Sequence, residues 1–225
     1  MFDAATTLAL LQYGDSAYPA GGFAFSWGIE GLAQDGLLSG QAGLDDLVFD
    51  HLTFRWNTMD RPLLVRACKA SNLAAVAAID RYIEAATVSA EMRVGSHRAG
   101  RALLSVSSRL GGPLSSGYRA IMAGDQRLGH LPVAQALVYR DGGLGLEESQ
   151  LLSGWTLVTG LVSAGVRLGV IGHVEAQRSM ASARGTLAEL IASDLPDKAQ
   201  PSSFTPLIDI AVCRGPSRHV RMFST

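Results

Sequence analysis

The apolar residues of this chain recur at helical spacing almost from end to end, and this periodicity limits the folds open to it. Between residues 44 and 56, apolar side chains follow one another three and four positions apart. Similar patterns predict helices over residues 72–83, 89–106, 114–123, 131–139, 146–170, 173–195 and 205–213. No stretch alternates apolar and polar residues for long enough to predict a strand. The sequence therefore predicts an all-α fold.

Capping residues and glycine–proline pairs mark where these helices are expected to begin and end. Asn72 and Ser89 are suitable N-caps, because their side-chain oxygens can accept a hydrogen bond from the first helical turn. Gly111-Gly112-Pro113 is expected to end one helix. Asp60-Arg61-Pro62 is expected to break a helix and start another, since proline suits a first turn but not a helix interior. Without a linker or repeat, we expect a single compact domain of about ten helices over residues 1–225.

Charge and composition exclude several function classes. The formal net charge is −1, which gives no electrostatic reason to expect nucleic acid or an anionic membrane as a partner. The chain opens without the basic region of a signal peptide, and Arg167 interrupts the longest apolar region, residues 151–171. The two cysteines, Cys68 and Cys213, form no CxxC pair and fit a reducing compartment. We therefore expect a cytoplasmic protein with no membrane span.

The motifs of nucleotide binding, metal binding and nucleophilic catalysis are missing from the sequence. No glycine-rich segment has the GxxxxGK[ST] or GxGxxG pattern, and no serine lies in a GxSxG elbow. No histidine pairs with another histidine or cysteine three or four positions away, so no single helix presents two metal ligands. The histidines are His51, His97, His130, His173 and His219. We expect structural or interface roles for them, with no metal or cofactor bound directly and no enzymatic activity, while a site assembled only by the tertiary fold stays open.

One alternative keeps an enzymatic or ligand-binding function. A pocket between helices could bind a small molecule and use His130 or His173 as its acid or base. The discriminating observation is whether these histidines converge with carboxylates in a closed pocket or lie on an open face.

The most unusual segment, residues 11–30, combines aromatic residues, glycines and one proline ahead of an expected helix. Pro19 fixes the backbone at the entry, whereas Gly22 permits a close backbone approach. Phe23 and its aromatic neighbours offer rigid apolar area. From residue types alone, two interpretations are equally favoured: an N-terminal plug that covers the core, and a partner-binding surface.

This segment resembles the signature of the urease accessory protein UreF family, in which an LLQ-type helix leads into a Pro-x-Gly-Gly-Phe-type turn. The matching residues are Leu11, Gln12, Asp15, Ser16, Pro19, Gly22, Phe23, Ser26, Gly28 and Glu30. Further blocks that are similar to the family follow in order within residues 91–104, from 129–130, within 161–178 and within 206–224. The chain departs from the family pattern at Trp27, His173, Ala176 and Gly215-Pro216.

The resemblance implies a helical, commonly dimeric adaptor that binds a UreD/UreH-type scaffold, recruits the GTPase UreG and docks on apo-urease during nickel delivery. It implies that the partners handle nickel and GTP. A direct nickel carrier is the further alternative. The candidate partner-binding residues are Pro19, Gly22, Phe23, Ser26, Glu30, Arg167, Gln177, Arg218, His219, Arg221 and Phe223.

Two groups among these candidates have more than one interpretation. Glu30 and Arg167 are charged residues in apolar surroundings, so they are expected to contact a partner or to form a structural ion pair. The tail, residues 214–225, carries basic donors and an aromatic residue behind Gly215-Pro216. It is expected to be flexible and to order on the scaffold, or simply to be a frayed terminus.

Overall fold

The computed structural model describes residues 3–18, 26–195, 200–215 and 222–223, and every regular element within them is helical. The elements are α1 (Ala4–Gly14), α2 (Ile29–Gln34), α3 (Gly40–His51), the π-helical segment η2 (Leu52–Asp60), α4 (Arg61–Lys69), α5 (Leu73–Ala86), α6 (Ala90–Arg109), α7 (Pro113–Met122), α8 (Leu131–Asp141), α9 (Leu146–Arg167), α10 (His173–Ala192) and α11 (Pro206–Cys213). Because α3, η2 and α4 run on as one rod, the described residues form ten separate helices. The predicted all-α class and the number of helices are confirmed.

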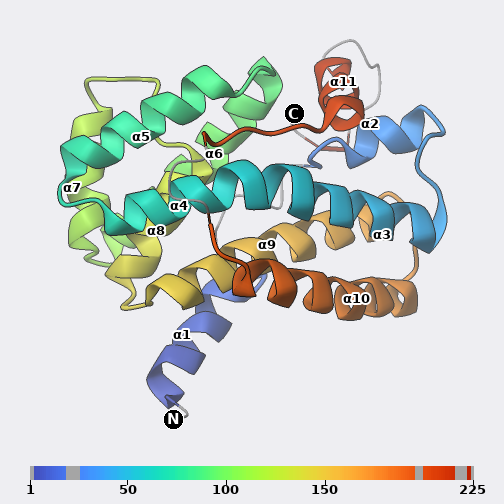
Figure 1. Ribbon diagram of the computed structural model, residues 1–225, viewed down its shortest axis with the longest axis horizontal. Coiled ribbons are helices and arrows are strands. Elements are labelled where there is room, and N and C mark those ends of the chain that lie inside the picture. The colour runs from blue at the N-terminus through green and yellow to red at the C-terminus, as the bar shows by residue number, and fades with distance from the viewer. Residues whose placement is uncertain (1–2, 19–25, 196–199, 216–221, 224–225) are drawn as a thin grey trace.

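The long rod α3–η2–α4 crosses the middle of the molecule, and the other helices pack around it (Figure 1). Helices α9 and α10 pack on each other and on α3, while α5 and α8 pack on α4, and α6 and α7 pack on α8. One apolar core lies among α2, α3, α9, α10 and α11, and a second lies among α4 to α8. Leu131 packs against both cores, which makes them continuous. No helix in the described ranges is long and apolar enough to cross a membrane.

The helix boundaries follow the predicted capping residues. The Asn72 side chain accepts a hydrogen bond from the Ala75 N–H at 2.9 Å, and the Ser89 hydroxyl accepts one from Met92 at 3.3 Å. Between α6 and α7, Gly111 adopts a φ of +92°, which a residue with a side chain rarely does. Local side-chain chemistry therefore sets these ends, as the sequence indicated.

The predicted break at Asp60-Arg61-Pro62 is wrong, because the helical backbone continues through Pro62 from α3 to α4. The proline ring lacks an N–H, so the Thr58 carbonyl loses its α-helical donor. The backbone N–H of Ser202 donates to that carbonyl instead, at 3.1 Å. A distant segment thus supplies the hydrogen bond that proline cannot make, and the chain has no reason to break there.

Arg61 ties this rod to the end of α10. Its guanidinium donates to the backbone carbonyls of Leu190 at 2.5 Å and of Ile191 and Ser193 at 3.0 Å. It also donates to the Gln150 side chain at 2.8 Å. These carbonyls belong to the last turn of α10, where backbone acceptors lack partners and the helix dipole favours a cation. Arg61 is therefore a capping residue supplied by another helix.

Candidate functional site

The end of the chain docks against the start of α2 and the end of α9. Phe223 is 3% exposed and belongs to the first apolar core. The backbone N–H groups of Met222 and Phe223 donate to the Glu30 carboxylate, at 2.5 and 3.3 Å. The Arg167 guanidinium carbon lies 4.0 Å from the centre of the Phe223 ring. Three predicted partner-binding residues, Glu30, Arg167 and Phe223, are therefore brought together.

This arrangement has a clear physical basis. Glu30 is 5% exposed, and a buried carboxylate is costly unless hydrogen bonds satisfy it. It lies in the first turn of α2, where the helix dipole favours negative charge, and the two tail N–H groups complete its hydrogen bonding. Arg167 lies in the last turn of α9 and stacks on an aromatic face, which attracts a cation. The two charged residues therefore position the end of the chain.

The other predicted partner-binding residues are distributed differently. Ser26 is buried, at 1% exposure, whereas Gln177 is exposed on α10. Pro19, Gly22, Phe23, Arg218, His219 and Arg221 lie outside the described residues.

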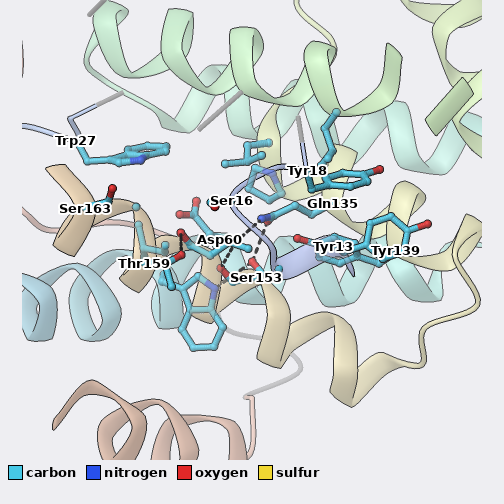
Figure 2. A pocket seen from close by; sticks show the side chains of 18 of the residues that line it. Tyr13, Ser16, Tyr18, Trp27, Asp60, Gln135, Tyr139, Ser153, Thr159 and Ser163 are labelled. Carbon is cyan, nitrogen blue, oxygen red and sulfur yellow. Dashed lines mark hydrogen bonds between the residues drawn. The ribbon is translucent and has the colours of Figure 1, made fainter. Parts of the chain in front are cut away.

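A cavity of about 730 Å³ is bordered by α1, η2, α6, α8, α9 and α10. Figure 2 shows Tyr13, Tyr18 and Tyr139 together on one side, with Trp27 and Ser163 on the other. Tyr18 and Trp27 lie on either side of segment 19–25 in the chain. Described residues on both sides of positions 19–25 therefore line this cavity.

A hydrogen-bonded row of polar side chains crosses the wall of the cavity. The indole N–H of Trp56 donates to the Ser153 hydroxyl at 3.2 Å, and Ser153 donates to the Gln135 carbonyl oxygen at 2.8 Å. The Gln135 amide then donates to the Thr156 hydroxyl at 3.3 Å. The row lets α8, α9 and η2 bury polar atoms without leaving them unpaired.

The buried tyrosines of the cavity are poor candidates for proton transfer at neutral pH. Burial raises the pKa of Tyr18 to about 12 and also raises the pKa of Tyr139, so both phenols stay protonated at neutral pH. Arg55 pairs with Asp60 at 3.6 Å, and no described lining residue is a histidine. The alternative with a histidine acid or base therefore receives no support from this cavity. His173, its second candidate, is exposed at the start of α10.

A second group of polar side chains lies between α5, α6 and the start of α8. The Nε2 atoms of His97 and His130 lie 3.0 and 2.9 Å from the same Glu84 oxygen, Oε2. Burial lowers the pKa of His130 to about 4 and also lowers the pKa of His97, so both rings are neutral at pH 7. Burial alone would raise the pKa of Glu84, but hydrogen bonds from the two histidines hold it below its usual value.

Asp80 fixes the backbone beside this group. Its carboxylate accepts hydrogen bonds from the Tyr118 hydroxyl at 2.5 Å and from the backbone N–H groups of Gly129 and His130 at 2.6 and 3.1 Å. Burial raises the pKa of Asp80 to about 6, although these hydrogen bonds act in the opposite direction. Asp80 therefore holds the turn that carries the His130 side chain.

Sequence reasoning did not find this group, and Glu84 was not a candidate at all. The three residues come from three elements and have no ligand-like spacing along the chain. A search for ligand pairs on one helix tests only local geometry. The contact exists because α6 approaches the turn before α8 closely at Gly100, where an added Cβ would lie 2.8 Å from the His130 carbonyl carbon.

Comparison with known proteins agrees with the family resemblance of the sequence blocks. The family model described as UreF matches residues 38–184, more than half of the chain. The urease accessory protein UreF of Trichodesmium erythraeum (strain IMS101) is 30% identical over 228 residues, which cover 99% of this chain and 98% of that protein. Proteins of the same name from Yersinia pestis (strain Pestoides F) and Yersinia pseudotuberculosis serotype I (strain IP32953) are 26% identical over 226 residues, 99% of each chain. The chain belongs to the UreF family of urease accessory proteins.

Proposed function

We propose that this protein is a non-catalytic adaptor in the maturation of urease. It binds a UreD/UreH-type scaffold, recruits the GTPase UreG and assists nickel incorporation into apo-urease. The observation that carries the proposal is similarity over nearly the whole chain to proteins named urease accessory protein UreF. GTP hydrolysis and the loading of nickel into the urease active site belong to the partners in this proposal.

The proposed scaffold-binding surface lies on α11 and the adjacent end of the chain. Leu207 and Ile210 on α11 are 53% and 50% exposed, and Met222 is 61% exposed. Their neighbours Ile208, Ala211 and Phe223 are buried in the first core, which fixes the exposed side chains in position. Rigid, exposed apolar side chains beside a buried anchor are typical of protein-binding surfaces. The predicted partner-binding residue Phe223 is buried, so in this proposal it anchors the docked tail and does not itself contact the scaffold.

The proposal also includes a homodimer and a cytoplasmic location, both of which the family resemblance implies. Light scattering on the purified protein tests the homodimer, which would have twice the chain mass of 23.7 kDa. A monomer across micromolar concentrations would remove the dimer from the proposal and leave the adaptor function open to its own test.

The adaptor function is tested by size-exclusion chromatography with light scattering, using the scaffold and UreG of the same host. We expect the wild-type protein to co-elute with both as one complex that also binds apo-urease. Failure to co-elute with a correctly folded scaffold would overturn the proposal.

A matched pair of variants tests the proposed surface. Leu207→Asp introduces a charge on α11 and is expected to reduce co-elution with the scaffold by at least tenfold in affinity. Leu110→Asp introduces the same charge at another exposed leucine, 69% exposed after the end of α6, and should leave binding unchanged. Equal binding by the two variants would place the scaffold elsewhere on the protein.

A further inference from the structure

Glu84, His97 and His130 form a compact group of possible metal ligands among the described residues. One ligand atom from each side chain lies within 4.8 Å of the other two. Glu84 comes from the end of α5, His97 from the first half of α6, and His130 is the residue before α8. The group is separate from the cavity, because none of the three side chains lines it.

We propose that Glu84, His97 and His130 bind a divalent first-row transition-metal ion such as Zn²⁺ or Ni²⁺. Two imidazoles and one carboxylate are a common donor set for these ions, whereas Mg²⁺ and Ca²⁺ prefer oxygen ligands alone. The two histidines would coordinate through Nε2 and Glu84 through its carboxylate. The expectation of no directly bound metal is revised by this proposal.

The two distances from the Glu84 oxygen to the histidine nitrogens are close to those of a metal site. Around a tetrahedral ion with ligands at about 2.0–2.1 Å, neighbouring ligand atoms are roughly 3.3 Å apart. The Glu84 oxygen now lies 3.0 Å from His97 Nε2 and 2.9 Å from His130 Nε2. Shifts of a few tenths of an ångström would open these contacts. Each neutral imidazole would then carry its proton on Nδ1 instead of Nε2, which leaves the Nε2 lone pair free to bind the ion.

One ligand is fixed, and the other two can adjust. The His130 side chain is fully buried, and Asp80 holds its backbone N–H. The side chains of His97 and Glu84 are 15% and 27% exposed. The two imidazole rings stack with centres 3.8 Å apart and planes tilted by 34°. The His97 ring must therefore turn before one ion can lie near the planes of both rings.

The site would be open and exchangeable. Three protein ligands leave at least one position for water, which is the pattern of sites that bind a further ligand or release the ion. Arg93 lies 3.4 Å from the other Glu84 oxygen, Oε1, so its positive charge would weaken cation binding. The Nδ1 atoms of both histidines are buried and have no hydrogen-bond partner among the described residues. Since such partners strengthen metal binding by roughly 10–100-fold, we expect a dissociation constant on the order of micromolar.

Calorimetric titration of the metal-free full-length protein with ZnCl₂, and separately with NiCl₂, tests the proposal. We expect one ion per chain for at least one of the two metals. His97→Gln removes one ligand at a partly exposed position and should weaken that binding by at least tenfold. Glu84→Gln provides a second variant, so that the test survives if either substitution disturbs folding, which circular dichroism would reveal.

Two control variants test whether other histidines bind the metal ion. His173→Gln changes an exposed histidine on α10, and His219→Gln changes one in the tail; neither should alter the affinity. No binding of either metal at 100-fold above the expected micromolar range would overturn the proposal, as would unchanged binding in folded His97→Gln and Glu84→Gln proteins. The measurement uses the isolated chain, so its outcome is independent of co-elution with the scaffold.

Discussion

The guanidinium of Arg167 lies over the ring of Phe223, 4.0 Å from its centre, and joins the end of α9 to the end of the chain. Glu30 completes the contact by accepting hydrogen bonds from the backbone N–H groups of Met222 and Phe223. The tail was expected to be flexible, yet this part of it contributes a side chain to the core. Flexibility over the rest of residues 214–225 stays a prediction.

The Phe223→Ala substitution should destabilise the protein by about 3–5 kcal/mol, the usual range for a buried phenylalanine in a core. It removes both the apolar burial and the ring on which Arg167 stacks. Urea unfolding followed by circular dichroism measures the change. Met222→Ala is the control, because that side chain is 61% exposed and should change stability by less than about 1 kcal/mol. Equal effects would show that Phe223 is not docked in solution.

Arg61→Ala should be among the most destabilising substitutions in the protein, because it removes several hydrogen bonds from a charged donor, each worth about 1.5–3 kcal/mol. Arg61 is 3% exposed, and its loss would remove a charged donor from the Ile191 and Ser193 carbonyls, whereas the Leu190 carbonyl keeps the Ser193 hydroxyl as a donor. The melting temperature of the variant, compared with that of Arg184→Ala on the exposed face of α10, measures the effect. A similar small shift in both variants would contradict the capping role.

Gly100→Ala and Gly160→Ala should change stability in opposite directions. At Gly100 an added methyl group meets the backbone of Gly129 and His130, which cannot move away as a flexible side chain could. We expect a loss of at least about 1–3 kcal/mol from overpacking. At Gly160, within α9, the methyl group meets nothing within 4 Å, so alanine should stabilise the helix by about 0.5–1 kcal/mol. Chemical unfolding measures the free energy of unfolding of both variants. A stabilised Gly100→Ala protein would refute the close approach of α6 to the turn before α8.

The His51→Gln variant should lose less stability than the wild type when the pH falls. His51 is fully buried and donates from Nε2 to the Trp27 carbonyl at 3.0 Å. Burial lowers its pKa to about 3, so its neutral form contributes stability that is complete above pH 6.5 and is lost as the pH falls toward 3. Removing the ring should reduce the slope of the free energy of unfolding against pH by up to about 1.4 kcal/mol per pH unit below pH 6.5.

The measurement is the free energy of unfolding between pH 7 and pH 5 for both proteins. His130, with a lowered pKa, acts in the same direction as His51, whereas Asp80 acts in the opposite direction because its raised pKa favours the protonated native state at low pH. Both contributions are common to the two proteins and cancel in the comparison. Identical slopes would mean that His51 is not held neutral by burial.

The sequence by itself determined the class of the fold and most helix ends. Helical periodicity needs only local spacing, and caps such as Asn72 and Ser89 act within one turn, so both can be read along the chain. The family resemblance also depended on the order of sequence blocks. It selected Glu30, Arg167 and Phe223, and a structural ion pair between the first two was one expectation, but the sequence did not indicate that both contact the end of the chain.

Tertiary structure alone decided the features that depend on distant segments. The helix continues through Pro62 because Ser202 supplies the donor for Thr58, a contact that no local rule contains. Likewise, Glu84, His97 and His130 meet only because α5, α6 and the turn before α8 come together, with α6 close to that turn at Gly100. Local propensity determines where helices form, whereas the packing of their side chains determines which distant polar groups become partners.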